Sequence, residues 1–164
     1  ERTEFAFPIK FRARSVMVDP HFLVLNRTPQ FRALKSAFAA NIRARGERFW
    51  KRYTEAEKIL REALEIESDP DIYGARFSIE VALGQLFAEQ KKFAEAKIYL
   101  QTALARPSRR AEILPSVYLS LAKVAKELND EETLKRAVSG AIAAEAALGG
   151  DTGAASEARS LLSK

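Results

Sequence analysis

The chain has 164 residues, of which 47% are hydrophobic, so it is long enough for one domain with a sizeable core. Its 27 Lys and Arg against 22 Asp and Glu give a formal net charge of +5. It contains no cysteine, which excludes a disulfide scaffold, a thiolate metal site and a cysteine nucleophile, and its single histidine, His21, excludes a histidine-rich metal site. With only 7 Gly and 6 Pro among many Ala, Leu, Glu, Lys and Arg residues, the composition excludes a collagen-like or long disordered chain and favours a helical domain.

Residues 1–28 differ from the rest of the chain and are expected to form an extended arm. Its first part alternates large apolar residues with others, which is the period of a strand: Phe5, Phe7, Ile9 and Phe11. Pro8 lacks an N–H group and therefore argues for an edge or a docked segment. Two interpretations stay open. Residues 4–25 pack over the following helices as a cap, or they occupy a groove of the same or a neighbouring molecule and cause self-association.

From residue 29 onward the hydrophobic residues recur with the period of a helix. Thr28-Pro29 and Asp69-Pro70 each predict a helix start, with a capping side chain followed by proline at the first helical position. Gly149-Gly150 is expected to end the sixth helix. The predicted apolar faces are Phe31, Leu34, Phe38 and Ile42; Tyr53, Ala56, Leu60, Ala63 and Leu64; Ile72, Ile79, Ala82, Leu83 and Leu86; Phe93, Ala96, Leu100, Ala103 and Leu104; Leu114, Val117, Leu121, Val124 and Leu128; Leu134, Val138, Ala141 and Ile142; and Ala155, Ala158, Leu161 and Leu162.

The sequence repeats itself at an interval of 40 residues. Residues 50–56 (WKRYTEA) align with residues 90–96 (QKKFAEA), and the apolar positions that follow align as well. A weaker copy comes 38 residues later, around residues 134–142. A generic antiparallel bundle shares the apolar period but does not predict the repeated block of cations, an aromatic residue and Glu-Ala. The repeat therefore favours a stack of similar helix hairpins.

The second copy resembles a tetratricopeptide repeat. The residues that carry the resemblance are Leu83-Gly84, Phe87, Phe93, Glu95-Ala96, Leu100, Ala103-Leu104 and Pro107. The resemblance implies an all-α superhelix of about three helix hairpins, over residues 29–68, 69–107 and 108–148. A capping helix in residues 149–164 would close it, and the extended arm would precede it.

Small side chains are expected where paired helices cross, and the connections between hairpins are expected to be long. Gly84 and Ala96 allow the helices to approach closely, while large residues fill the space between neighbouring pairs. The intervals of 40 and 38 residues exceed the family repeat of about 34. We therefore expect extended helices or extended inter-repeat turns around residues 68–73 and 108–114.

The resemblance also implies where a partner binds. In the family, the first helices of the hairpins line a concave surface that grips an extended or helical segment of another protein. Carried over at helical spacing, that surface would present Asn41, Arg45 and Arg48; Ser78, Val81, Gln85 and Ala88; and Ser116, Leu119, Lys123 and Lys126. Four of these side chains are cationic and none is acidic, so the expected ligand is a segment that carries carboxylates. The competing interpretation is an ordinary solvated face.

One subset of the family grips the C-terminal carboxylate of cytosolic chaperones. The positions that need Asn, Lys and Arg for that purpose hold Ala82, Ser116 and Ser120 in this chain. The sequence therefore predicts that this specialisation is absent.

An alternative function rests on the basic first third of the chain. Residues 1–61 hold 14 cationic and 6 acidic side chains, whereas the remainder holds 13 and 16. One block interleaves cations with aromatic residues: Arg43, Arg45, Arg48, Phe49, Trp50, Lys51, Arg52 and Tyr53. Such a block suits a nucleic-acid strand or an anionic membrane surface.

The sequence contains no motif of a known catalytic site. It has no phosphate-binding glycine loop, no dinucleotide fingerprint and no nucleophile elbow, and His21 has no partner in a recognisable motif. We therefore expect a non-catalytic scaffold or adaptor without a cofactor. The compartment stays open between the cytoplasm and the soluble part of an exported or membrane-anchored protein.

Overall fold

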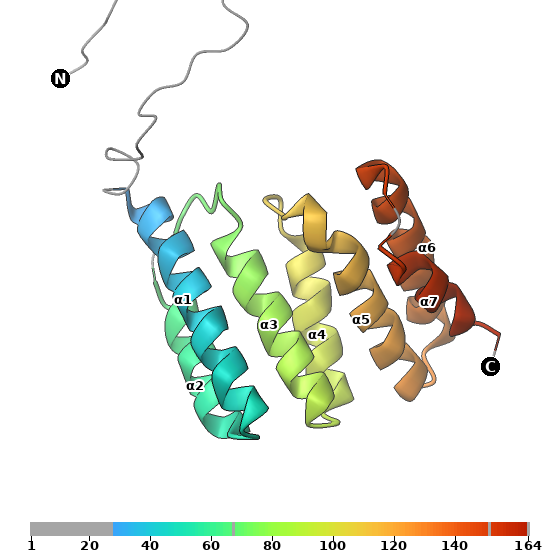
Figure 1. The fold of residues 1–164 in the computed structure, drawn as a ribbon, viewed down its shortest axis with the longest axis horizontal. Helices are drawn as coiled ribbons and strands as arrows, with labels where there is room; N and C mark the ends of the chain where they lie inside the picture. The colour runs from blue at the N-terminus through green and yellow to red at the C-terminus, as the bar shows by residue number, and fades with distance from the viewer. Residues whose placement is uncertain (1–27, 67, 151, 164) are drawn as a thin grey trace, which may run out of the picture.

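The computed structural model describes residues 28–66, 68–150 and 152–163 (Figure 1). The arm expected in residues 1–28, including His21, therefore lies outside the described residues except for Thr28. The described residues form helices and connecting loops without a strand. None of these helices is both long and apolar enough to cross a bilayer.

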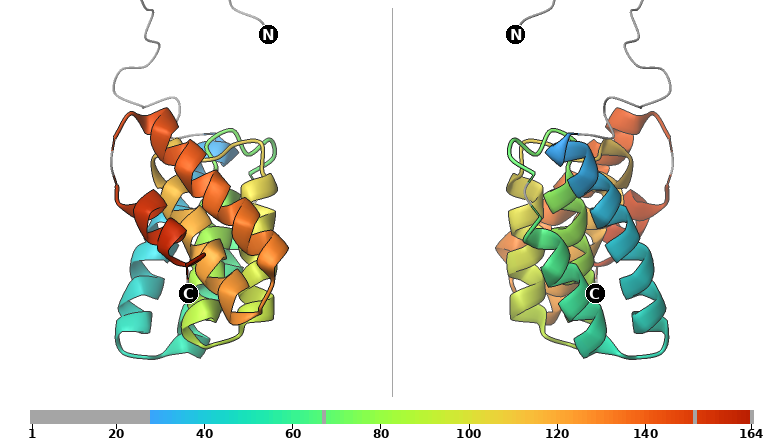
Figure 2. Two further views of the ribbon diagram at one scale, coloured as in Figure 1. Left: turned by 90° about the vertical axis from the view of Figure 1, so that its right-hand side faces the viewer. Right: turned by 90° about the vertical axis from the view of Figure 1, so that its left-hand side faces the viewer.

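Six of the helices form three antiparallel hairpins that stack side by side (Figure 1). The helices α1, α3 and α5 lie on one face of the stack, and α2, α4 and α6 lie on the other (Figure 2). The last helix, α7, packs on α5 and α6 and closes the far end. This arrangement confirms the expected all-α superhelix with a C-terminal capping helix. The helices are α1 (Pro29–Phe49), α2 (Tyr53–Leu64), α3 (Ala75–Glu89), α4 (Phe93–Ala105), α5 (Leu114–Glu127), α6 (Glu131–Leu148) and α7 (Ala154–Ser160), with a 3-10 turn, η2 (Ala111–Ile113), before α5.

All three hairpins turn in the same way, although only two of them share a clear sequence motif. A residue with positive φ ends the first helix of each pair: Lys51 at 57°, Lys91 at 59° and Asn129 at 54°. In the first hairpin the N–H of Arg52 then donates to the carbonyl oxygen of Glu47 at 2.8 Å, which closes a Schellman-type turn. The equivalent bonds are Lys92 N to Phe87 O and Asp130 N to Ala125 O, both 2.9 Å.

Close helix approach within the second hairpin depends on Gly84. A Cβ atom at this position would lie 2.6 Å from Cγ of Leu100 and 3.3 Å from the carbonyl oxygen of Ala96. Leu100 and Ala96 are both fully buried. Gly84 therefore occupies the helix crossing that the sequence predicts, and a larger residue there would push α3 and α4 apart.

The predicted inward face of α1 is wrong in part. Phe38 and Ile42 are 52% and 66% exposed. The helix instead buries a stripe of small residues against α2 and α3, namely Ala33, Ala37, Ala40 and Ala44. Alanine lets the helix backbones come close, whereas a phenylalanine at the crossing would hold them apart. The large side chains are therefore left on the outer surface.

The predicted helix start at Asp69-Pro70 is also wrong. The helix begins at Ala75, and Ile72, which was assigned to its buried face, is 57% exposed. The carboxylate of Asp71 accepts hydrogen bonds from the N–H groups of Ala75 and Arg76, at 2.8 and 2.9 Å. This carboxylate takes the role of a capping side chain. The long connection expected before α3 is thereby confirmed, as is the one before α5.

A buried ion pair fastens α3 to the connection after α4. The side chain of Glu80 is only 5% exposed and accepts two hydrogen bonds from the guanidinium of Arg106. These bonds raise the pKa of Arg106 above its usual value. Because Glu80 has lost its water while Arg106 stays partly exposed, the pair contributes mainly by fixing the geometry of the joint between the second and third hairpins.

Two side chains hold the capping helix α7 at its two ends. The carboxylate of Glu145 accepts hydrogen bonds from the N–H groups of Thr152 at 2.5 Å and Ala155 at 2.9 Å, and from the Thr152 hydroxyl. At the other end, the ammonium group of Lys126 donates to the carbonyl oxygen of Leu161 at 2.8 Å. A carboxylate at the N-terminus and a cation at the C-terminus both complement the helix dipole.

Replacing two of the helical glycines, Gly84 and Gly46, by alanine should have opposite effects. Gly84→Ala should lower the free energy of unfolding by about 1–3 kcal/mol, because the new methyl group would overpack the α3–α4 crossing. Gly46→Ala in α1 should raise it by about 0.5–1 kcal/mol, because a Cβ there has no atom within 4 Å and alanine restricts the unfolded chain. Urea unfolding measures both values, and a loss of stability in both variants would contradict the assignment of the crossing.

Acid should release the capping helix. The hydrogen bonds from Thr152 lower the pKa of Glu145 below its ordinary value near 4.5. The carboxylate therefore stabilises the fold fully above that ordinary value, and its contribution is lost as the pH falls further. Glu145→Gln should lower the melting temperature at neutral pH, and the difference from the parent chain should shrink below about pH 4.5. A difference that is independent of pH would show that the charge of Glu145 does not hold α7.

Candidate functional site

A hollow of about 490 Å³ is lined by residues of α1, α3 and α5. Its walls come from all three hairpins and from the loop that leads into α5. The lining residues are Phe38, Asn41, Ile42, Arg45, Arg48, Ser78, Val81, Ala82, Gln85, Arg110, Ile113 and Ser116. No single helix supplies the whole wall. The stacking of the hairpins is what brings these residues together.

Most of the predicted groove residues lie in this hollow. Those brought together are Asn41, Arg45, Arg48, Ser78, Val81, Gln85 and Ser116. Ala88 and Leu119 instead pack partly buried against the hydrophobic core. The remaining two, Lys123 and Lys126, are engaged by α7, so the third hairpin contributes less to the hollow than the sequence suggests.

The capping helix accounts for the two lysines. The ammonium group of Lys123 forms an ion pair with Glu157 of α7 at 2.7 Å. Lys126 donates to the carbonyl oxygen of Leu161, as described above. Both cations thus help to hold α7 on α5. The two helices pack against each other (Figure 2).

Apolar side chains form one part of the hollow. Phe38 and Ile42, one turn apart on α1, are more than half exposed there. Val81 of α3 and Ile113 before α5 also line it. The exposed side chains of Phe38 and Ile42 form an apolar surface that is unfavourable in water. Burial of this surface by a partner would lower the free energy of the complex.

Three cations border the apolar part, and no acidic residue lines the hollow. Arg48 is neutralised by a two-bond pair with Glu89 at the end of α3. Arg110 pairs with Glu112 at 2.6 Å and lies 5.5 Å from the centre of the Phe38 ring. Glu112 itself has a lowered pKa, chiefly through a hydrogen bond to its own backbone and then through Arg110.

Arg45 is the cation that is left for an external anion. Its side chain is exposed and forms no ion pair with the described residues. It follows Ile42 by one turn, so the charge lies beside the apolar part. An anionic group that enters the hollow meets Arg45 without first breaking an internal pair.

The small polar side chains are tied back to their own helices. Asn41 donates to the carbonyl oxygen of Ala37 at 2.9 Å, and Ser78 donates to that of Gly74 at 2.9 Å. Ser116 does the same toward Ile113 at 2.8 Å. The oxygens of these groups keep their capacity to accept hydrogen bonds, so the polar rim can bind donors such as peptide N–H groups.

Sequence reasoning missed five of the lining residues: Phe38, Ile42, Ala82, Arg110 and Ile113. A signal for the first two was present, because alanines at positions 33, 37, 40 and 44 already form a stripe at helical spacing. A stripe of small residues competes with the larger residues for the inward face. Arg110 and Ile113 lie in a loop and a 3-10 turn, where no periodic pattern places a side chain.

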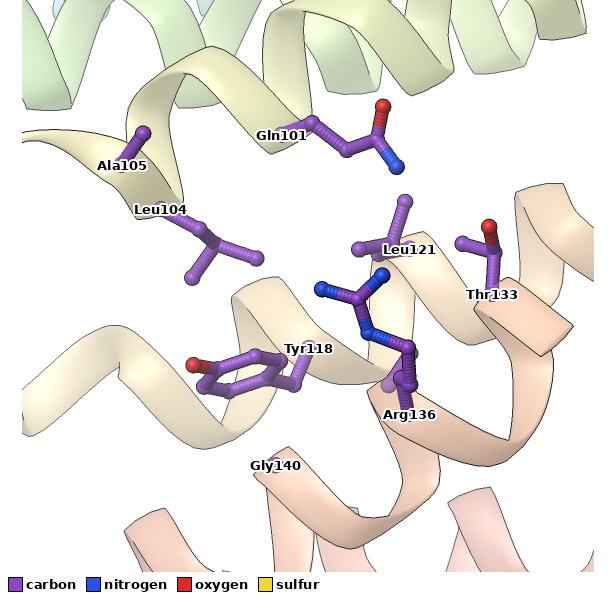
Figure 3. A pocket seen from close by; sticks show the side chains of 9 residues that line it. Gln101, Leu104, Ala105, Tyr118, Leu121, Thr133, Arg136 and Gly140 are labelled. Atoms are coloured by element: carbon purple, nitrogen blue, oxygen red, sulfur yellow. The ribbon is translucent and has the colours of Figure 1, made fainter.

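A second hollow of about 380 Å³ opens between α4, α5 and α6 (Figure 3). The ring of Tyr118 lies against Gly140, where a Cβ atom would come within 2.4 Å of the ring. Gln101 and Arg136 point into the same space from opposite sides (Figure 3). This hollow separates adjacent hairpins rather than spanning all three, and Arg136 at its rim is largely exposed and already lies near Glu132.

Neither hollow brings together metal ligands. Across residues 28–66, 68–150 and 152–163, no three His, Cys, Asp or Glu side chains are placed so that they could hold a metal ion. What the larger hollow offers is apolar contact area, a free guanidinium and a rim of hydrogen-bonding groups. These are the means of recognising another molecule.

Comparison with known proteins agrees with the geometry. Residues 81–107, which form most of α3 and all of α4, match the family model described as tetratricopeptide repeat. The chain contains a tetratricopeptide repeat. No curated protein and no solved structure gives a significant match. Tetratricopeptide repeats generally mediate protein–protein interactions and are typically non-catalytic.

Proposed function

We propose that this domain is a non-catalytic scaffold or adaptor that binds a segment of another protein in the hollow between α1, α3 and α5. The observation that carries the proposal is the combination, in one hollow, of exposed Phe38 and Ile42 with the free guanidinium of Arg45. The segment carries a large apolar side chain and, close to it, a carboxylate.

The apolar contacts supply most of the affinity. Full burial of a Phe or Ile side chain contributes about 1.5–3 kcal/mol, so covering the exposed part of Phe38 and Ile42 contributes roughly 1–2 kcal/mol each. An exposed ion pair to Arg45 contributes about 0–1 kcal/mol. Charge therefore acts mainly on the choice of partner and on the rate of association, because it excludes basic segments and attracts acidic ones.

The dimensions suit a short segment. A hollow of about 490 Å³ is within the range of small-ligand sites and accommodates a few side chains rather than a folded domain. Its lining includes only Ser116 of α5, whereas Lys123 and Lys126 farther along this helix engage α7. We therefore place the bound segment across α1 and α3, with contact to the start of α5.

Selection from a random peptide library displayed on phage, with the intact domain as target, tests this proposal. We expect the enriched peptides to combine Leu, Phe or Trp with Asp or Glu. Ile42→Ser should weaken a selected peptide about tenfold, since it removes an apolar contact of roughly 1–2 kcal/mol. Arg45→Glu should shift the preference toward basic peptides. Fluorescence polarisation measures the dissociation constants.

Two variants on the opposite face serve as controls. Ile98→Ser in α4 changes an apolar residue that is 62% exposed, and Arg136→Glu in α6 reverses an exposed cation. Both should leave binding unchanged. If they weaken it as strongly as Ile42→Ser and Arg45→Glu do, or if selection enriches no peptide, the hollow is not the binding site.

A further inference from the structure

The tip of the first hairpin carries an exposed aromatic pair. Phe49 ends α1 and is 77% exposed, and Trp50 follows it and is 67% exposed. Their rings touch edge to face with centroids 5.2 Å apart. Neither lines the hollow described above. The pair therefore forms a separate apolar surface at the end of the α1–α2 turn.

The turn itself does not require aromatic residues. The other two hairpins have the same backbone conformation and the same closing hydrogen bonds, as described above. At the positions of Phe49 and Trp50 they carry Glu89-Gln90 and Glu127-Leu128. Folding of the hairpin thus explains neither aromatic side chain, and two large apolar groups in water indicate a surface that becomes covered.

Cations accompany the aromatic pair along one edge. Lys51, Lys91 and Lys92 occupy the tips of the first two hairpins, and none of them forms an ion pair with the described residues. The acidic residues beside the tips are partly neutralised, since Glu47 pairs with Arg52 and Glu89 pairs with Arg48. Glu55 and Glu95 remain in the first turns of α2 and α4.

The third tip has a different character. It carries Glu127, Asp130, Glu131 and Glu132, of which Asp130 pairs with Lys97, Glu131 with Lys135 and Glu132 with Arg136. The three tips follow one another along the lower edge of the stack (Figure 1). The aromatic pair and the lysines without an ion pair therefore lie at one end of this edge, and that end would face an anionic surface.

We propose that the α1–α2 and α3–α4 tips dock onto an anionic membrane surface, with Trp50 and Phe49 entering the headgroup region. Tryptophan favours the boundary between hydrocarbon and water, and lysines at the same level attract anionic headgroups. The tips lie together at one edge of the stack, where a flat surface can contact them (Figure 1). A single strand of nucleic acid needs aromatic faces along a groove, and these rings lie outside the hollow and pack against each other.

The single tryptophan of the chain makes the test direct, because Trp50 reports on its own environment. The full chain is mixed with vesicles of phosphatidylcholine and phosphatidylglycerol. We expect a blue shift of Trp50 fluorescence and protection from the aqueous quencher acrylamide, whereas vesicles of phosphatidylcholine alone leave both unchanged. Unchanged fluorescence with both kinds of vesicle would overturn the proposal.

Sedimentation with the same vesicles measures the contribution of each group. Lys51→Gln/Lys91→Gln should lower partitioning about 30-fold, since each cation near the surface contributes about fivefold. Phe49→Ser/Trp50→Ser should lower it about tenfold or more. Ile98→Ser removes an exposed apolar residue away from the tips and should have no effect. A circular dichroism melt of each variant establishes that it is folded.

Other occupants of the tip give different results, and each would overturn the proposal. Quenching of Trp50 by single-stranded RNA, without vesicle binding, would assign the tip to nucleic acid. A blue shift that grows with protein concentration in the absence of lipid would assign it to a second copy of the chain. A tryptophan that is already shielded from acrylamide in dilute solution would show that another part of the same chain covers it.

Discussion

Close approach of paired helices is the constraint on which this structure depends. Gly84 lets α3 lie against Leu100 and the backbone at Ala96, and the buried alanines of α1 allow the same closeness to α2 and α3. Small residues at a helix crossing let the two backbones touch. The backbones then make the dispersion contacts that large side chains would otherwise make. The hairpins can then stack with a nearly constant offset, which leaves α1, α3 and α5 on one continuous face.

The same constraint creates the hollow. Because alanines occupy the inward face of α1, Phe38 and Ile42 are turned outward, and they border the hollow together with Arg45. The hollow includes only the start of α5, while at the far end of the stack Glu145 holds the start of α7 and Lys126 holds its end. The packing of α1 thus determines both which of its residues enter the core and which of them line the proposed binding site.

The two proposed surfaces lie on different parts of the stack and can act together. The hollow lies on the face of α1, α3 and α5, whereas Phe49 and Trp50 lie at the turn between α1 and α2. Arg48 lines the hollow and directly precedes Phe49 in the chain, and its pair with Glu89 joins the ends of α1 and α3. A domain docked by its hairpin tips would keep the hollow open to a partner protein.

The sequence by itself determined the helical class, the repeat and the crossing at Gly84, because these depend on local spacing and residue size. The resemblance to the tetratricopeptide repeat placed Asn41, Arg45, Ser78 and Gln85 on one surface, and helical periodicity, which is a local property, kept the residues of each helix on one side. Only the tertiary structure decided which side of α1 faces inward, that Asp71 rather than Asp69 caps α3, and that α7 engages the lysines of α5. Those outcomes depend on contacts between residues that are distant in sequence, where several side chains could fill the same space or bind the same partner. A local sequence pattern does not show which side chain does so.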